Sequence, residues 1–405
     1  MQTRIRRIGY KFRIYPTEEQ KVFFERHFGC SRFIYNYLLA LREAAYKKFK
    51  IKISGFEAKK EISKLKKQEE YQWLKEVNSQ SLQESAIDLE KAYRRFFKKL
   101  GSKPRFKKKL NKQQFKIPQY FNLHVSKNEN YFLEIPKLKS TIRVNVHREI
   151  EGTIKQATIA RSASGDYFVS FNCEIKEEVP CLLKTSNNHE IGIDLGLTSF
   201  ITTSDGGKKE APKFLRKLER HLKSAQKSLS RKEKRSSNWY KAKKQVAVVH
   251  ENISNHRKDF LHKLSSELVN ENQVIYLEDL NVKGMMRNRY LSKSIADASW
   301  GEFTRQLTYK ASWRYKKVAQ IGRFEPSSKL CSRCNTINKE LRLCDRRWKC
   351  KSCLSIHDRD INAAKNILKI GQGMPECKSV EKSTSIFSFK KKQVGSVKQE
   401  PVSKC

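Results

Sequence analysis

Four of the ten cysteines occur as two Cys-x2-Cys pairs. Cys331 and Cys334 form the first pair, and fifteen residues separate it from the second pair, Cys350 and Cys353. This spacing is typical of a zinc ribbon, in which each pair turns two thiolates toward one tetrahedral ion. Because four thiolates leave no coordination position for water, we expect one structural zinc ion. Cys344 lies between the pairs, and we expect it to take no part.

Three carboxylates form a second candidate site, because each belongs to an otherwise apolar segment. Asp194 lies in a strand-like segment, Glu278 ends another, and Asp360 shares a helix face with alanines and aliphatic residues. Each acid alone has an ordinary explanation, as a strand end, a cap or an ion-pair partner. Together, three carboxylates on apolar elements would be costly unless a cation compensates them.

The chemistry of such a site follows from its ligands. Carboxylate oxygens favour Mg²⁺ or Mn²⁺, and two such ions can clamp the attacking water and the leaving oxygen of a phosphodiester. The three acids are therefore candidate catalytic residues and metal ligands for phosphodiester hydrolysis. Gly192 and Gly196 share the strand face of Asp194, and we expect them to let a phosphate or metal ion approach closely. Asp358 is expected to be the N-cap of the helix that carries Asp360.

The charge of the chain indicates the class of its partner. Lys and Arg number 86 against 42 Asp and Glu, a formal charge of +44, whereas a hydrophobic share of 38% argues against wholesale disorder. A polyanion would relieve this self-repulsion, so nucleic acid is the expected partner. No apolar stretch approaches the roughly 18 residues of a membrane span, and none of signal length follows the charged start. We therefore expect a cytoplasmic protein with no membrane partner.

The first part of the chain predicts strands around a group of helices. Residues 4–15 resemble a strand with one basic face, and Thr17 opens a capping box for a helical segment interrupted near Gly29. An amphipathic helix is expected around 82–100, followed by short strands from 114 to 175. Because the first strand is isolated, the economical arrangement is a β-barrel that includes it and carries a helical lobe as an insertion.

The second part predicts a mixed α/β domain after a linker at 176–189. The expected elements are strands at 190–196 and 198–204, a long helical hairpin, a strand at 273–280, a helix at about 296–317, a strand at 318–324, the cysteine insert and a helix from about 358. Residues beyond Gly371 show little periodicity and are expected to be disordered.

A set of motifs in this order resembles the TnpB family, the transposon-encoded RNA-guided DNA endonucleases related to type V CRISPR effectors. The motifs are Gly-Ile-Asp194-Leu-Gly, Leu-Glu278-Asp-Leu, Asp297-Ala-Ser-Trp-Gly-Glu-Phe, the two Cys-x2-Cys pairs and Asp358-Arg-Asp360-Ile-Asn-Ala-Ala-Lys-Asn-Ile. The similarity covers nearly the whole chain, including the N-terminal Tyr-Pro and Ser31-Arg-Phe-Ile-Tyr-Asn.

The resemblance implies a multidomain α+β fold. It consists of an RNase H-like (RuvC) α/β nuclease domain with an inserted zinc ribbon, plus an N-terminal β-barrel (wedge) domain carrying an inserted helical recognition lobe. The expected ranges are 1–16 and 105–180 for the barrel, 17–104 for the lobe, 186–326 and 355–371 for the nuclease domain, 327–354 for the ribbon and 372–405 for a disordered tail.

The resemblance also implies the activity and its partners. Asp194, Glu278 and Asp360 would be the acidic triad of an insertion-sequence endonuclease that cleaves DNA next to a short transposon-associated motif. The partners would be a guide RNA from the transposon end and double-stranded target DNA, in a prokaryotic cytoplasm at the nucleoid. The motif would be recognised near Ser79, Gln80 and Gln83.

Two alternatives stay open at this point. A DNA-joining transposase could use the same acidic fold, and strand transfer rather than cleavage would identify it. A non-catalytic zinc-ribbon regulator of transposition would need no acidic triad, so metal-dependent activity that is lost on changing Asp194 would exclude it.

Overall fold

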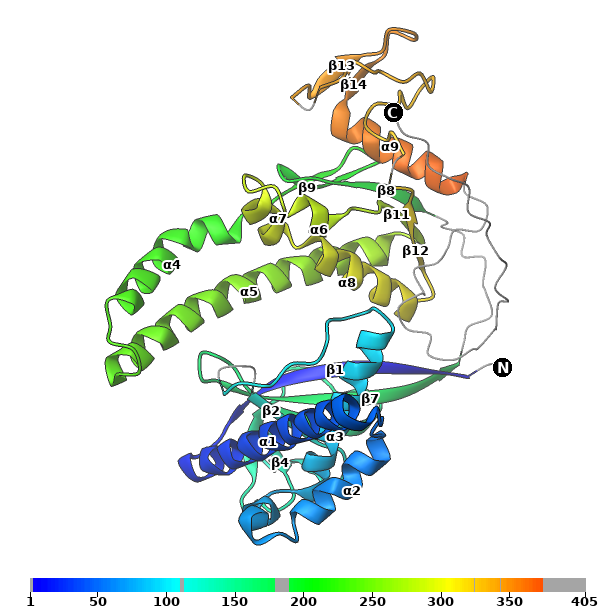
Figure 1. Ribbon diagram of the computed structural model, residues 1–405. Coiled ribbons are helices and arrows are strands. Elements are labelled where there is room, and N and C mark those ends of the chain that lie inside the picture. The colour runs from blue at the N-terminus through cyan, green and yellow to red at the C-terminus, as the bar shows by residue number, and fades with distance from the viewer. Residues whose placement is uncertain (1–2, 110–112, 179–188, 324, 343, 374–405) are drawn as a thin grey trace, which may run out of the picture. The chain divides into compact units, whose positions relative to one another are not determined.

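The computed structural model describes residues 3–109, 113–178, 189–323, 325–342 and 344–373 (Figure 1). The chain divides into two compact units. We call them the first unit (Met1–Leu183 and Leu218–Asn252) and the second unit (Lys184–Lys217 and Ile253–Cys405). The expected disordered tail lies outside the described residues from 374 onward, and so does most of the expected linker, from 179 to 188.

The first unit contains a seven-stranded antiparallel sheet in the order β2-β6-β7-β1-β5-β4-β3. Its strands are β1 (Thr3–Tyr15), β2 (Gln113–Ile117), β3 (Asn122–Val125), β4 (Tyr131–Glu134), β5 (Ile142–Asn145), β6 (Thr153–Arg161) and β7 (Tyr167–Glu178). Tyr10, Phe12 and Ile14 of β1 are buried in the core of this sheet, while the basic residues between them are exposed. The strand predicted at 4–15 is therefore confirmed, and it pairs with later strands as expected. β2 and β3 are the two edge strands of this sheet. Closure of the sheet into a barrel therefore stays a prediction.

Helices connect β1 to β2. α1 (Glu18–Phe49) begins with the predicted capping box at Thr17, α2 (Gly55–Leu65) precedes a 3-10 helix at Glu69–Lys75, and α3 (Ser79–Phe97) carries the predicted amphipathic stripe.

The predicted interruption of the first helix near Gly29 is wrong, because α1 is continuous there. Phe24, Phe28 and Ile34 are buried on either side of the glycine, and their packing outweighs its low helix propensity. In the described part of the chain, no helix combines the length and apolar character that crossing a membrane requires.

The second unit contains a five-stranded mixed sheet in the order β10-β9-β8-β11-β12. The strands β8 (Glu190–Leu195), β11 (Val274–Glu278) and β12 (Lys317–Ile321) are parallel, whereas β9 (Ser199–Thr203) and β10 (Lys208–Glu210) pair antiparallel. The four strands predicted for this part of the chain are confirmed, with shifted ends. β10 was not predicted, because its three exposed charged residues give no apolar alternation.

The predicted long hairpin corresponds to α4 (Phe214–Ser230) and α5 (Ser237–Glu271). The boundary between the two units passes through both helices. The C-terminal part of α5 and α8 (Trp300–Trp313) pack on one face of the five-stranded sheet, against Ile193 and Leu277 among others.

The helix predicted at 296–317 is interrupted, which corrects that expectation. After a short helix α6 (Val282–Met285), α7 (Ser292–Ala298) ends and α8 begins at Ser299, whose φ is 55°. Left-handed backbone is unfavourable for serine, so tertiary contacts must compensate it. Asp297 supplies them: its carboxylate accepts from the Leu215 backbone N–H at 3.1 Å and pairs with Arg257 at 2.7 Å.

On the opposite face of the sheet lies α9 (Arg359–Gln372), preceded by a hairpin of β13 (Arg347–Lys349) and β14 (Ile356–Asp358) (Figure 1). The backbones approach closely: a Cβ added to Gly192 would lie 2.2 Å from the Ala364 carbonyl oxygen, and one added to Gly371 would lie 2.1 Å from the Tyr276 ring. Such distances exclude any side chain at either position.

The expectation that Gly192 and Gly196 open space for a metal ion or a phosphate is therefore wrong. Gly192 makes room for α9. A Cβ at Gly196 would lie 2.6 Å from the Ser199 carbonyl oxygen, so this glycine permits the tight connection from β8 to β9.

We predict that Gly192→Ala destabilises the protein by about 2–3 kcal/mol, because the added methyl group must push α9 away from β8. Thermal unfolding of the two proteins measures this difference. Gly301→Ala is the matched control: this exposed glycine of α8 has no atom within 4 Å of an added Cβ. It should raise the stability by about 0.5–1 kcal/mol. Equal unfolding temperatures for Gly192→Ala and wild type would contradict the packing argument.

Candidate active site and metal centre

Asp194 and Glu278 occupy neighbouring positions on two parallel strands. β8 and β11 pair with Leu277 opposite Ile193, so the next residue of each strand is a carboxylate. Paired residues of parallel strands point to the same face of a sheet. Both acids therefore lie on the face of Gly192, which α9 covers.

The third acid reaches this site on α9. Asp358 is the N-cap of the helix, as predicted, and its carboxylate accepts hydrogen bonds from the backbone N–H groups of Asp360 and Ile361, each at 3.1 Å. Asp360 thus stands in the first turn, one turn before Ala364, whose backbone contacts β8. Asp358 also forms an ion pair with Lys208 at 2.8 Å, which gives it a structural role.

The electrostatic environment of Asp194 includes the other two acids. Burial, followed by the charges of Glu278 and Asp360, raises the pKa of Asp194 from 3.8 to about 7. Arg359 opposes this shift only in part. A carboxyl group at such a position is expensive to ionise without a compensating cation.

Two contacts that the sequence did not predict hold the other acids. The Ser327 hydroxyl donates a hydrogen bond to Oε1 of Glu278, and Arg346 donates to Oδ1 of Asp360 at 3.4 Å. In the part of the chain that the structure describes, the three carboxylates do not form a group as close as the cysteines do.

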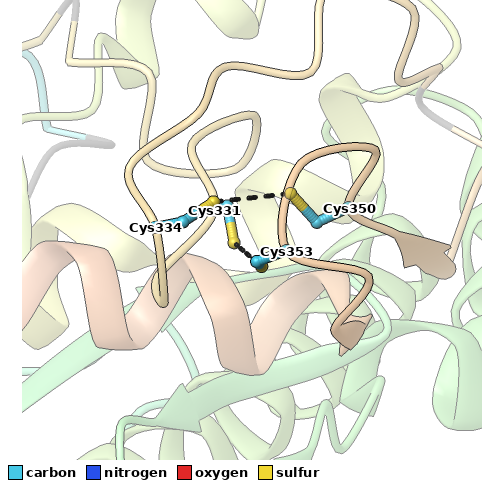
Figure 2. A group of neighbouring side chains, drawn as sticks. All are labelled: Cys331, Cys334, Cys350 and Cys353. Atoms are coloured by element: carbon cyan, nitrogen blue, oxygen red, sulfur yellow. Dashed lines mark hydrogen bonds between the residues drawn. The ribbon is translucent and has the colours of Figure 1, made fainter.

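The four cysteines predicted as zinc ligands converge between two loops (Figure 2). Their sulfur atoms all lie within 4.8 Å of one another, with 3.6 Å between Cys331 and Cys353 and 3.5 Å between Cys334 and Cys350. Tetrahedral coordination with Zn–S bonds of about 2.3 Å places sulfurs about 3.8 Å apart, so the cluster fits zinc.

The two loops share one local design. A left-handed residue follows the second cysteine of each pair, Asn335 with φ 62° and Leu354 with φ 58°. The hydroxyl of Thr336 lies 3.3 Å from the sulfur of Cys334, and that of Ser355 lies 3.3 Å from the sulfur of Cys353. These hydrogen bonds lower the pKa of both thiols, that of Cys334 to about 6, and so favour the thiolates that bind metal. Cys344 is exposed and stands outside the cluster.

His357 is a contact of the cluster that the sequence analysis missed. Its Nε2 lies 3.1 Å from the sulfur of Cys331, and its ring packs against Trp348 with 4.8 Å between centroids. The sequence feature that could have identified His357 is its position directly before the N-cap Asp358, where the cysteine insert meets α9. A ring N–H directed at a metal thiolate is a common way to orient the ligand.

The residues expected to recognise a duplex motif lie at the start of α3 in the first unit. Ser79 accepts from Lys66 Nζ at 2.6 Å, Gln80 donates to Gln119 Oε1 at 3.1 Å, and Gln83 is exposed. This hydrogen bond joins α3 to the connection that follows β2. Their role in binding stays a prediction.

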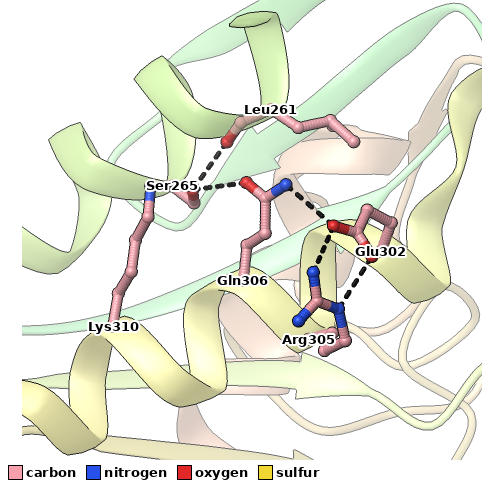
Figure 3. Close-up of polar contacts among 6 residues, drawn as sticks. All are labelled: Leu261, Ser265, Glu302, Arg305, Gln306 and Lys310. Atoms are coloured by element: carbon pink, nitrogen blue, oxygen red, sulfur yellow. Dashed lines mark hydrogen bonds and ion pairs between the residues drawn. The ribbon is translucent and has the colours of Figure 1, made fainter. Parts of the chain in front are cut away.

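The remaining acidic motif, Asp297 to Phe303, serves helix packing. Glu302 binds Arg305 at 2.6 and 2.8 Å and accepts from Gln306 at 3.1 Å, and Gln306 lies 3.1 Å from the Ser265 hydroxyl of α5 (Figure 3). Lys310 donates to the same hydroxyl at 2.7 Å, and burial lowers its pKa to about 8. This network joins α5 to α8 and contains none of the three candidate catalytic acids.

Comparison with protein families gives three matches along the chain. Residues 170–289 match a family described as probable transposase, and residues 300–367, which contain the cysteines and Asp360, match the TNB domain of Cas12f1-like proteins. Residues 1–51 match a family described as a helix-turn-helix domain. In this structure that segment is the strand β1 followed by the continuous helix α1, so the description does not fit its fold.

Similar proteins extend over almost the full length. A Streptomyces pristinaespiralis protein named as an RNA-guided DNA endonuclease is 37% identical over 371 residues, which cover 91% of this chain and 90% of the relative. The Escherichia coli (strain K12) protein named as RNA-guided DNA endonuclease InsQ is 32% identical, covering 91% and 93%. The fold is similar to that of Cas12f1 in a complex with guide RNA and target DNA, with a TM-score of 0.59, 15% identity and coverage of 87% and 83%.

We predict about one zinc ion per chain, measured by elemental analysis of purified protein. Cys331→Ser or Cys353→Ser should abolish stoichiometric zinc and lower the unfolding temperature by about 5–10 °C, because the region before α9 loses its cross-link. Cys344→Ser, an exposed cysteine outside the cluster, should keep zinc and stability. Full stability in zinc-free protein would contradict this assignment.

We also predict an unusual pH dependence caused by Asp194. Its pKa is about 7 in the folded state and near 3.8 when unfolded, so the folded protein binds more protons between these values and loses stability as the pH rises through them. In zinc-loaded protein without Mg²⁺ or Mn²⁺, Asp194→Asn should raise the unfolding temperature at pH 8 and less at pH 5.

Glu271→Gln provides the control for this experiment, because Glu271 is an exposed carboxylate at the end of α5. It should change the unfolding temperature little at either pH. A gain for Asp194→Asn that is the same at pH 5 and pH 8 would show that burial of charge is not its cause.

Proposed function

This chain belongs to the TnpB family of RNA-guided DNA endonucleases, and from this membership we propose how it cuts DNA. Guided by an RNA from the transposon end, it cleaves double-stranded DNA next to a short transposon-associated motif. Asp194, Glu278 and Asp360 of an RNase H-like domain hold the catalytic ions, and the four cysteines hold one structural zinc ion.

One observation carries this proposal. Asp194 and Glu278 lie on the sheet face that α9 covers, and Asp360 lies in the first turn of α9. Burial, followed by the charges of Glu278 and Asp360, raises the pKa of Asp194. A folded protein avoids such repulsion unless a cation is to be bound there. The parallel pairing of β8 with β11 and the packing of α9 support the RNase H-like interpretation.

The roles of the side chains follow from this arrangement. Two Mg²⁺ or Mn²⁺ ions would supply the charge that activates the attacking water and stabilises the leaving oxygen. Asp194 would bind from β8. Glu278 would bind from the neighbouring strand β11, and Asp360 would bind from α9.

The charge of the chain supports the RNA partner. A surplus of 44 positive groups is far more than solubility requires, and a bound RNA would neutralise much of it before DNA is met. Base pairing with the RNA would then select the target DNA sequence, and the protein would recognise only the short duplex motif.

The experiment reconstitutes the protein with its RNA and supplies plasmids that carry matching or altered targets. We expect Mg²⁺-dependent cleavage that follows the guide segment when that segment is changed, while the short motif stays the same. RNA-free protein should bind DNA weakly, without sequence preference and with steep salt dependence. Equal cleavage of a defined site by RNA-free protein would refute RNA guidance.

Variants of the acids separate binding from cutting in the same assay. Asp194→Ala, Glu278→Ala and Asp360→Ala should each reduce cleavage by at least about 100-fold and leave DNA binding by the RNA complex nearly unchanged. Asp358→Ala is the control, since Asp358 caps α9 and faces Lys208. An active Asp360→Ala with an inactive Asp358→Ala would reverse the assignment of the third acid.

A transposase that joins DNA is the second candidate, since one matching family is described as probable transposase. The same reactions distinguish it. Products in which a DNA end is joined to another molecule would favour this alternative, and free cut ends favour the endonuclease.

A further inference from the structure

We propose that Ser327 positions Glu278 for catalysis, and that two asparagines of α9 hold Ser327 in place. This inference rests on the proposed function, because it takes Glu278 as a metal ligand. It adds residues outside the acidic triad and assigns a task to three residues that contact α9 near the first cysteine pair, Ser327, Leu330 and Ser332.

The first link is a buried hydrogen bond. Ser327 is 3% exposed, and its hydroxyl donates to Oε1 of Glu278. Glu278 is the last residue of β11, so neighbouring strands do not restrain its side chain on both sides. A donor on one carboxylate oxygen restricts its rotamer and directs the second oxygen toward the site.

The second link fixes the backbone of Ser327. Asn366 of α9 is completely buried, and its side-chain NH₂ group donates to the carbonyl oxygens of Ser327 at 2.7 Å and Leu330 at 2.6 Å. Its own side-chain oxygen is buried without a hydrogen-bond partner in the described part of the chain. An unsatisfied buried oxygen lowers the stability of the folded protein. The presence of Asn366 is therefore better explained by its hydrogen bonds to the backbone of Ser327 and Leu330 than by a contribution to stability.

The third link repeats this contact one helical turn earlier. Asn362, 1% exposed, donates to the Leu330 carbonyl at 2.7 Å and accepts from the Ser332 N–H at 2.9 Å. Residues four apart lie on the same face of a helix, so Asn362 and Asn366 together clamp the segment around Leu330 along α9.

Through these contacts, α9 positions two of the three acids. The helix carries Asp360 directly, and through Asn366 and Ser327 it restrains Glu278. The clamped segment continues into Cys331, so zinc binding and the position of Glu278 are linked through the same residues. In the proposed mechanism, Ser327 touches neither ion nor DNA and acts only through Glu278.

The test compares Ser327→Thr with Ser327→Val in the RNA-bound protein. These side chains have nearly the same shape, but only threonine keeps the hydroxyl. We expect Ser327→Thr to cut DNA at a rate within about threefold of wild type. Ser327→Val should cut at least about tenfold more slowly than wild type. The Mg²⁺ concentration at its half-maximal rate should rise by a similar factor, because a misplaced ligand weakens metal binding. Ser328→Ala, a change of the adjacent serine, is the control and should behave as wild type.

Two further measurements do not depend on cleavage. Mn²⁺ titration followed by electron paramagnetic resonance should show weaker binding for Ser327→Val than for Ser327→Thr, and thermal unfolding should show both variants folded. Asn366→Ala should shift Mn²⁺ binding in the same direction as Ser327→Val. Equal Mn²⁺ binding and equal rates for the threonine and valine variants would overturn the proposal.

The variant Glu278→Gln distinguishes failure of the proposed function from failure of the role inferred for Ser327. If it cuts as wild type does, then Glu278 is not a ligand and the proposed function of the site fails together with this inference. If Glu278→Gln is inactive while Ser327→Val equals Ser327→Thr, the acidic site stands and only the role of Ser327 is wrong.

Discussion

The close packing of α9 against β8 is the constraint on which the second unit depends. Gly192 and Gly371 allow the helix to lie on the sheet at a distance that no side chain at these positions would permit. Asp360 can approach the strand acids only because of this short separation. Alanine at Gly192 would push α9 away from β8 and so change the geometry of the site. Gly192 of the acidic motif therefore makes room for a helix, and Gly196 permits the tight connection from β8 to β9; neither glycine serves access for a ligand.

Bringing the acids together has an electrostatic cost that the rest of the unit must offset. Burial and the two neighbouring carboxylates raise the pKa of Asp194 to about 7, and a fully ionised site would be unstable without cations. Arg346 and Ser327 hold the other two carboxylates in the described structure. Such a site is stabilised by whatever positive charge enters it, which is the condition that a metal-dependent nuclease needs.

The cysteine cluster contributes to the same site from outside it. Zinc would fix the loops that precede α9, and the segment that leads to Cys331 is bound to the helix by Asn362 and Asn366. Metal-dependent folding of a small insert would thereby be coupled to the placement of an acid that lies elsewhere in the sequence. The large positive charge acts at longer range, by attracting the RNA and DNA on which the acids would operate.

The sequence alone predicted most of the elements, the cysteine cluster and the candidate catalytic acids. Apolar periodicity predicted the strands that carry Asp194 and Glu278 and the helix that carries Asp360, and the Cys-x2-Cys spacing predicted the cluster, because these signals are local. Only the tertiary structure decided which residues meet. Continuity of α1 through Gly29, the break at Ser299, the partner of Gly192 and the hydrogen bond from Ser327 to Glu278 depend on packing between segments far apart in the chain. No local pattern encodes such contacts, since their free energy arises from burial and hydrogen bonding that exist only after folding.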